Sequence, residues 1–271
     1  MKSYSGKTAL VTGASSGIGK AIAASLAARG ARLILVARSK DKLEELAIQL
    51  RGPSGPEAVV IAMDLAAPGA AARLGEEAVR RGLTVDLLIN NAGFGKWGNF
   101  LDESFEFETY AEMVDLNIRA VVELCHVFLP AMAARGDCGI LNVGSTGSFV
   151  PVPWAAVYGA TKAFVLSFSE ALYYEYRDRG VQVTALCPGN TESNFARVAN
   201  AAAEKGAKAG DSPEMVADVG LDALLKGACS VIPGASNQQV AWLPRLLSRK
   251  RVVTIAGETW RKTLRARGVA V

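Results

Sequence analysis

The sequence predicts a single α/β domain in which one doubly wound parallel sheet of about seven strands carries helices on both faces. Seven short apolar runs, rich in Val, Ile and Leu, recur along the 271 residues, and helical patterns separate them. A strand buried on both faces forms a near-continuous apolar run, so this alternation is typical of parallel sheets covered by helices. Half of the residues are hydrophobic, enough for a sizeable core, and no linker or repeat interrupts the series.

The seven runs supply the expected strands, and the helices lie between them. In chain order the runs are TALVTG, RLILVA, AVVIAM, DLLINN, GILNVG, VQVTALC and CSVIPG. We expect helices over residues 17–29, 39–51, 67–82, 106–134, 157–179 and 213–226. Residues 190–211 break the alternation, are rich in small residues and follow a strand end. Ligands bind beyond the carboxyl ends of strands in such sheets, so this segment is a candidate lid.

The composition argues against a metal site and against catalysis by histidine. The single histidine, His126, lies in an apolar helical run, where a structural role is expected. The four cysteines show no CxxC or Cys/His spacing and are expected to be reduced core residues. No motif supports nucleic-acid binding. The N-terminus shows no apolar signal region, and no later run is judged long enough to span a bilayer, so a cytoplasmic location is expected.

The net charge of +4 is unevenly distributed along the chain. Between residues 239 and 271, eight basic residues stand against one acidic residue, so this segment carries +7 and the rest −3. A solvated helical face is the commoner interpretation of such a basic tail. Contact with a membrane surface, with phosphates or with a partner subunit is the alternative.

The stretch TGASSGIG, residues 12–19, follows the first expected strand and opens the first expected helix. Its first glycine permits a tight turn, its second lets the backbone approach a pyrophosphate, and its third allows close helix–strand packing. The helix N-terminus presents N–H groups to phosphates. The stretch therefore predicts a Rossmann-type dinucleotide site. Its expected cofactor contacts are Gly13, Ser15, Ser16, Gly17, Ile18 and Gly19.

The second expected strand ends in Ala37 and Arg38, where many such proteins have an acidic residue. An acidic side chain would bond the ribose 2′-hydroxyl of NAD, whereas an arginine accommodates the 2′-phosphate of NADP. The sequence therefore favours NADP(H), with Ser15 as a second phosphate contact. The alternative is that Arg38 only covers the surface.

The stretch VYGATKAF places Tyr158 and Lys162 four residues apart on an expected helix. Residues with this spacing lie on the same helix face, so the two polar groups can share one small volume. A phenol has an ordinary pKa of about 10, and a nearby cation favours its ionised form. We therefore expect Lys162 to lower the pKa of Tyr158. A lone pair of this kind would more simply be a snorkelling lysine beside a half-buried tyrosine.

Further motifs follow the other strand ends in a fixed order. They are Asp64, NNAG at 90–93, Asn117, Ser145 and PGNTES at 188–193. Together with TGxxxGxG and YxxxK, they resemble the short-chain dehydrogenase/reductase family over nearly the whole chain. Within that family, SPEMVADVGLDALLKG, VIPG and PRLLSRK resemble a bacterial subgroup of general oxidoreductases. One departure is Ser193, where the family often has threonine.

This resemblance implies an NADP(H)-dependent oxidoreductase that interconverts a carbonyl and an alcohol. Tyr158 would be the general acid or base, and Ser145 would hydrogen-bond the carbonyl oxygen. Lys162 would tune Tyr158 and bind the nicotinamide ribose, and Asn117 would hold a water that connects the lysine to solvent. The further implied cofactor contacts are Asp64, Leu65, Asn91, Ala92, Gly93, Tyr158, Lys162, Pro188, Gly189 and Thr191.

Two segments beside the catalytic residues carry aromatic side chains that suit an apolar pocket. FGKWGNF follows NNAG, and FVPVPW lies between Ser145 and Tyr158. We expect a bulky apolar ketone, aldehyde or alcohol as the substrate, although about half of these side chains could instead pack loops onto the core. The candidate substrate contacts are Phe94, Trp97, Phe149, Trp154 and Phe195.

We assign residues 1–236 to the dinucleotide-binding and catalytic domain and residues 237–271 to a basic helical C-terminal extension of the same domain. The expected helices at 106–134 and 157–179 are apolar on more than one face. The sheet covers only one face of each, so a homo-oligomer packed through these helices is expected, as in many members of the family. The rival interpretation of the whole chain is a sensor or scaffold that binds NADP(H) without turnover.

Overall fold

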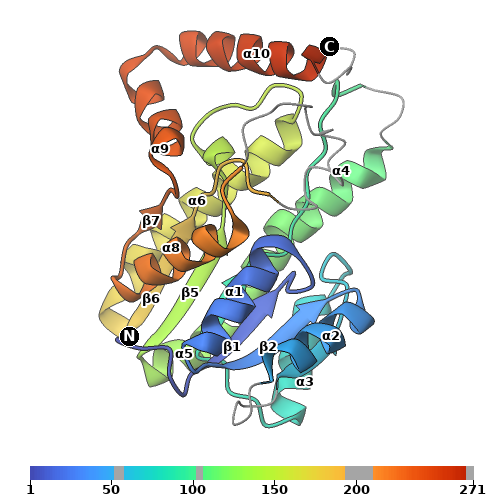
Figure 1. The fold of residues 1–271 in the computed structure, drawn as a ribbon, viewed down its shortest axis with the longest axis vertical. Helices are drawn as coiled ribbons and strands as arrows, with labels where there is room; N and C mark the ends of the chain where they lie inside the picture. The colour runs from blue at the N-terminus through green and yellow to red at the C-terminus, as the bar shows by residue number, and fades with distance from the viewer. Residues whose placement is uncertain (52–57, 102–105, 193–209, 267–271) are drawn as a thin grey trace.

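The computed structural model describes residues 1–51, 58–101, 106–192 and 210–266, and it shows one parallel sheet covered by helices on both faces (Figure 1). The strand order is β3-β2-β1-β4-β5-β6-β7, and every neighbouring pair is parallel. The predicted fold class is confirmed. The strands are β1 Thr8–Thr12, β2 Arg32–Ala37, β3 Val59–Ala62, β4 Leu87–Asn90, β5 Cys138–Val143, β6 Val181–Leu186 and β7 Ser230–Val231.

Successive residues of the central strands point to opposite faces of the sheet and so build two apolar cores. On β1, Val11 belongs to the core beneath α1 and α8, whereas Leu10 belongs to the core beneath α3 and α5. Both side chains are fully buried, which is why the strand is apolar at every position.

Eight of the helices are α1 Gly17–Ala28, α2 Lys40–Leu50, α3 Ala70–Arg80, α4 Phe107–Val114, α5 Ala120–Arg135, α6 Ala156–Tyr176, α8 Pro213–Leu225 and α9 Ala235–Trp242.

The expected helix at 106–134 exists, but a π-helical turn over Asp115–Arg119 divides it into α4 and α5. The continuous helical stretch Phe107–Arg135 is also long and apolar enough, by length and composition, to cross a membrane. The expectation that no run reaches that length is therefore wrong. Leu124 and Phe128 of this stretch are nonetheless buried against the sheet, as in the core helix of an α/β domain.

The C-terminal extension forms α9 and a further helix, α10, which spans Arg249–Ala266. In Figure 1, α10 lies across the end of the molecule that is farthest from α2 and α3. Val252 and Leu264 of α10 are buried, whereas basic residues such as Lys250 and Lys262 are exposed. Within the described residues, the basic tail therefore includes an amphipathic helix with one face against the domain.

A buried polar chain links the central strands to α6. The Asn90 side-chain amide donates to Asn142 Oδ1 at 2.8 Å, and Asn142 Nδ2 donates to Ser169 Oγ at 2.9 Å. The Ser169 hydroxyl then donates to the Val165 carbonyl at 2.6 Å. Buried polar groups without partners are costly, so this chain fixes the position of α6 on the sheet.

Replacing Ser169 with alanine should lower the free energy of unfolding by about 1–3 kcal/mol, because the Asn142 amide would lose its acceptor in the core. The exposed Ser167, two residues earlier on the same helix, provides the control. Ser167→Ala should change stability by less than about 0.5 kcal/mol. Urea unfolding followed by circular dichroism measures both; equal losses in the two variants would contradict a role for this polar chain.

Candidate active site

The glycine-rich turn after β1 is tightly packed, and its glycines are required by that packing. Gly13 has φ +64°, and a Cβ there would lie 2.9 Å from Cα of Ala92. A Cβ on Gly19 would lie 2.3 Å from the Gly13 carbonyl oxygen. The Asn91 side chain donates to the Thr12 carbonyl at 2.9 Å and so joins the turn to the end of β4. Asn91 therefore shapes the turn.

The N-terminus of α1 presents its backbone N–H groups beside this turn. Ser16 stands at the N-cap position without a side-chain cap hydrogen bond, and the first turn carries no acidic residue. These features suit an anionic phosphate group. Ser15, Gly17 and Ile18 lie in the same turn, as the sequence predicts.

The ends of β2 and β3 lie on one side of this turn, because β1, β2 and β3 are neighbours in the sheet. Arg38 is exposed immediately after β2, and within the described residues no hydrogen bond or ion pair holds its guanidinium. Asp64 Oδ1 accepts from the Ala66 backbone N–H at 3.1 Å, while Leu65 is buried. Arg38 is therefore an exposed cation at the sheet edge beside the glycine-rich turn.

Asn117 is the central residue of the π-helical turn, and its side chain is buried. Its Nδ2 donates to the Phe94 carbonyl at 2.9 Å and to Thr161 Oγ1 at 3.0 Å, and its Oδ1 accepts from the Phe94 N–H at 3.1 Å. A Cβ on Gly93 would lie 2.8 Å from Asn117 Oδ1. π-Helical turns often mark functional sites, and this one carries Asn117 to the loop after β4.

Ser145 begins a 3₁₀ turn over Thr146–Ser148 that follows β5. Its hydroxyl accepts from the Gly147 N–H at 3.1 Å, and its own N–H donates to Ser148 Oγ at 3.2 Å. The Ser148 hydroxyl donates to the Lys162 carbonyl at 2.8 Å. Ser148 thus connects the serine turn to α6, a role that the sequence reasoning missed.

Tyr158 and Lys162 lie one turn apart on α6, and both are buried. Lys162 Nζ donates to the Val143 carbonyl at 2.7 Å and lies 5.9 Å from the centre of the Tyr158 ring. The Ser145 hydroxyl is close enough to the Tyr158 phenol to affect its pKa. Thr161, which bonds Asn117, also donates to the Tyr158 carbonyl at 2.8 Å. All four predicted catalytic residues therefore meet at one site, and Thr161 was not predicted.

The pKa of Tyr158 differs from the sequence expectation. Burial raises the pKa of Tyr158 to about 12, and the neighbouring Ser145 hydroxyl opposes this rise. Burial also lowers the pKa of Lys162 to about 8. The expectation that Lys162 lowers the Tyr158 pKa is therefore wrong here, because the ammonium is directed to the Val143 carbonyl and desolvation dominates.

The PG turn after β6 is held by α9. A Cβ on Gly189 would lie 2.3 Å from Asn237 Oδ1, so the Asn237 side chain packs directly on this glycine. Asn237 Nδ2 donates to Asp211 Oδ2 at 2.8 Å, and the backbone at Asp211 pairs with Thr191. Pro188 accepts from the Thr146 N–H at 2.8 Å, which ties this turn to the serine turn. Ser193, Phe195 and most of the candidate lid lie outside the described residues.

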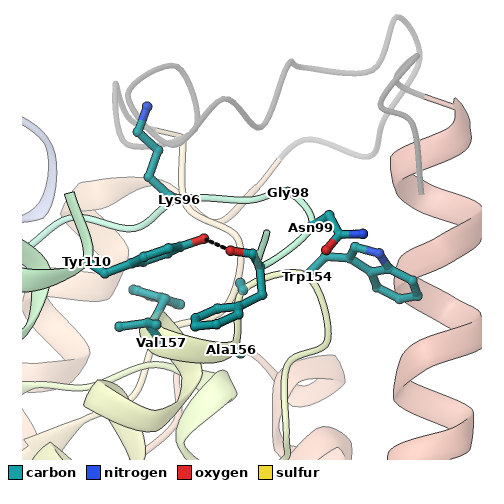
Figure 2. Close-up of a pocket in the computed structure, with 10 residues that line it drawn as sticks. Lys96, Gly98, Asn99, Tyr110, Trp154, Ala156 and Val157 are labelled. Atoms are coloured by element: carbon teal, nitrogen blue, oxygen red, sulfur yellow. Dashed lines mark hydrogen bonds between the residues drawn. The ribbon is translucent and has the colours of Figure 1, made fainter. Parts of the chain in front are cut away.

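A pocket of about 200 Å³ opens beside Tyr158 (Figure 2). Its lining is aromatic and aliphatic with two polar side chains, and Tyr110 donates to the Phe100 carbonyl at 3.3 Å across one wall. The lining residues are Lys96, Gly98, Asn99, Phe100, Tyr110, Trp154, Ala155, Ala156, Val157 and Tyr158. The pocket therefore combines apolar rings with polar groups, as small-molecule sites commonly do.

The structure divides the candidate substrate residues into three groups. Trp154 lines the pocket. Trp97 is buried behind Tyr158, with ring centres 5.1 Å apart, and Phe94 packs in the same cluster. Phe149 instead packs near Leu166 and Cys187, in a separate cluster, so its assignment to the pocket is not supported. The contributions of Phe100, Tyr110 and Val157 were missed, because those residues look like ordinary helix and loop positions in the sequence.

A doubly wound sheet with a phosphate-binding turn and a Ser, Tyr, Lys, Asn cluster at the same edge is the arrangement of a dinucleotide-dependent oxidoreductase. Among the described residues, no three His, Cys, Asp or Glu side chains are grouped to hold a metal ion. Residues 7–204 match the family model for short chain dehydrogenases. The chain belongs to the short-chain dehydrogenase/reductase family.

Individual relatives cover most of the chain. Human very-long-chain 3-oxoacyl-CoA reductase is 34% identical over 195 residues, which are 71% of this chain but only 62% of that protein. A short-chain dehydrogenase from Sphingobium yanoikuyae in complex with NADPH is 31% identical, with TM-score 0.76 and 94% of each chain covered. The bulky-bulky ketone specific alcohol dehydrogenase from Comamonas testosteroni is 32% identical, with TM-score 0.74, 89% of this chain and 92% of that chain covered.

The buried ammonium of Lys162 should make stability depend on pH. Its pKa is about 8 in the folded chain and 10.5 for the ordinary group, so between these values the unfolded chain holds a proton that the folded chain lacks. The contribution of Lys162 to the free energy of unfolding should therefore rise as the pH increases from 8 to 10.5. Lys162→Met should remove this rise.

The measurement is the free energy of unfolding in urea for wild type and Lys162→Met at several pH values across that range. Their difference cancels the contribution of the buried Cys125 thiol, whose raised pKa lowers stability at alkaline pH. Lys20→Met, at an exposed position on α1, should run parallel to wild type. A difference between wild type and Lys162→Met that stays constant with pH would refute this assignment.

Proposed function

We propose that the protein is an NADP(H)-dependent oxidoreductase that interconverts a carbonyl and an alcohol on a bulky, largely apolar substrate. The observation that carries the proposal is that Tyr158, grouped with Ser145, Lys162 and Asn117, forms part of the wall of a pocket. The phenol of Tyr158 thus supplies a proton donor in the wall of the space that a carbonyl oxygen would enter, and Ser145 supplies a second hydroxyl near that phenol.

Each residue of the cluster has a defined task in this proposal. Tyr158 holds the proton that the carbonyl oxygen receives, and its raised pKa keeps that proton in place until negative charge develops on the oxygen. Ser145 hydrogen-bonds the same oxygen and stabilises its developing charge. Lys162, held by the Val143 carbonyl, provides positive charge beside Tyr158. Asn117 fixes the loop at Phe94 that borders the site.

The cofactor assignment rests on residues at the opposite side of the same sheet edge. NADPH, when bound, supplies the hydride for carbonyl reduction. The glycine turn and the α1 N-terminus suit its phosphates, and Arg38 suits a 2′-phosphate. The Sphingobium yanoikuyae relative, whose structure contains NADPH, supports this choice.

The substrate class rests on the pocket lining. Phe100, Tyr110, Trp154 and Val157 provide apolar surface, and the pocket volume of about 200 Å³ accommodates a ring or a short chain. The Comamonas testosteroni relative is described as specific for ketones with two bulky groups, which agrees with this lining. The human relative is described as a 3-oxoacyl-CoA reductase, so an acyl chain is a second group to test.

We also propose that the protein forms a homo-oligomer. Phe164 is 37% exposed on α6, where its ring stacks on Phe168, and Val114 is 40% exposed at the end of α4. These apolar side chains lie on the helices that the sequence selects as an interface, and their exposure supports burial against a second copy.

Tyr158→Phe should abolish carbonyl reduction and leave NADPH binding unchanged, because only the proton donor is removed. The experiment combines NADPH oxidation, followed by absorbance with a panel of apolar ketones, aldehydes and a 3-oxoacyl thioester, with NADPH titration by fluorescence. Tyr110→Phe, which removes a hydroxyl on another wall of the pocket, is the control and should retain turnover. NADPH binding without turnover of any panel member by the wild type would instead favour the sensor interpretation.

Arg38→Ala should weaken NADPH binding by about 10- to 100-fold, the range expected for a lost hydrogen bond to a charged group. Binding of NADH should not change, because NADH lacks the 2′-phosphate. Arg32→Ala, at the opposite end of the same strand, removes an equal charge as a control. Parallel fluorescence titrations with both cofactors give the result; equal losses for NADH and NADPH would mean that Arg38 does not read the 2′-phosphate.

A further inference from the structure

The C-terminal helix α10 packs against the back of the candidate active site. Leu264 is fully buried, in the same apolar cluster as Tyr158 and Trp97, and Trp260 packs on this cluster one turn earlier. None of the residues that line the pocket belongs to α10. Contacts from α10 therefore reach the pocket only through the residues that form its walls.

One contact of α10 reaches Tyr158 through two tilted aromatic pairs. The ring centre of Trp97 lies 5.1 Å from that of Tyr158 and 6.0 Å from that of Trp260. Both pairs are tilted, an arrangement favoured by the quadrupoles of aromatic rings. Trp97 is thus held between α10 and Tyr158, so a displacement of Trp260 would change the packing on the catalytic ring.

A second contact holds the pocket wall itself. Trp154 has φ +62°, a left-handed backbone conformation that a bulky residue adopts only when its surroundings enforce it. Its carbonyl accepts from the Gly98 N–H at 2.8 Å, and the Arg261 guanidinium lies 5.5 Å from the centre of its ring. Arg261 is in turn paired with Glu258 of the same helix at 3.2 Å. Figure 2 shows the Trp154 ring directed toward this helix.

We propose that α10 sets the size of carbonyl substrate that the site accepts, with Arg261 as the positioning residue for Trp154 and Trp260 as the positioning residue for Trp97 and Tyr158. The inference rests on the proposed function and adds to it a determinant outside the pocket. Trp154 is held in a strained conformation, so its ring needs the contact with Arg261 to stay in one place. A bulky substrate reaches Trp154, so its binding depends on the Arg261–Trp154 contact. A small substrate does not reach Trp154, so its binding does not depend on that contact.

Substitutions of the two positioning residues, Arg261 and Trp260, should change different kinetic constants. Arg261→Met should raise KM for the diaryl ketone benzophenone about threefold, a typical effect of losing a half-exposed cation–π contact. It should leave KM for the smaller acetophenone unchanged. Trp260→Ala should lower kcat for both ketones about fivefold, because an aromatic pair that supports the Tyr158 position is lost. Trp260→Phe should restore most of kcat.

Lys262→Met is the matched control, because it removes the same charge from the outer face of the same helix. It should leave both KM values and both kcat values unchanged. If Arg261→Met and Lys262→Met gave the same ratio of kcat/KM for benzophenone over acetophenone, the assignment of Arg261 would be overturned. If Trp260→Phe did not recover kcat, Trp260 would be needed only for folding and its positioning role would be refuted.

Ligand binding provides a readout that does not depend on turnover. Trp97, Trp154 and Trp260 are three of the four tryptophans, and the fourth, Trp242, is 66% exposed. In a Trp242→Phe background, tryptophan fluorescence therefore reports on this cluster, and benzophenone should quench it. Arg261→Met should weaken that binding about threefold, as it does KM. No turnover by wild type would defeat the proposed function alone, whereas equal benzophenone affinity in wild type and Arg261→Met would defeat the inference.

Discussion

The attachment of the first turns of α6 to the end of β5 is the constraint on which the site depends. Lys162 Nζ bonds the Val143 carbonyl, and Ser148 bonds the Lys162 carbonyl in the opposite direction. These two bonds fix the distance between the serine turn and the helix that carries Tyr158. The Asn90–Asn142–Ser169 chain attaches the same helix farther along, so α6 is held by polar contacts over several turns. Burial of the lysine is costly in free energy, and its hydrogen bond to the Val143 carbonyl offsets part of that cost.

The fold and the grouping of the Ser, Tyr, Lys and Asn side chains could be predicted because their signals are local. Each of the seven strands is a continuous apolar run, and each run was found in the structure close to its expected place. The glycines of TGASSGIG were assigned from turn geometry, and Gly13 and Gly19 have no room for a side chain. Tyr158 and Lys162 share a helix face because of their spacing alone. In all these cases the determining contacts lie within a few residues or follow from the order of strands in a parallel sheet.

The features that were not predicted depend on contacts between distant segments. Thr161 and Ser148 are ordinary helix and loop residues in the sequence, and their partners lie 44 and 14 residues away. Phe149 and Trp154 stand in one short aromatic segment, yet they pack in different clusters because the chain turns sharply between them. The direction of the Tyr158 pKa change also required the structure, since burial outweighs a cation that is turned toward a carbonyl. The spacing of two residues in the sequence predicts that their side chains are close. It does not predict how far burial removes those side chains from water.

The π-helical turn at Asn117 also rotates the helix that follows it relative to the helix that precedes it. Met113 and Leu124 are eleven residues apart, a spacing that returns an uninterrupted α-helix to nearly the same side after three turns. Met113 nevertheless packs with Trp97 and Tyr158, whereas Leu124 packs under the sheet. The turn thus acts as a phase shift that lets one continuous helix serve two different cores. Deleting one residue within Asp115–Arg119 would bring both halves back into phase, and one of the two cores would then lose its apolar face.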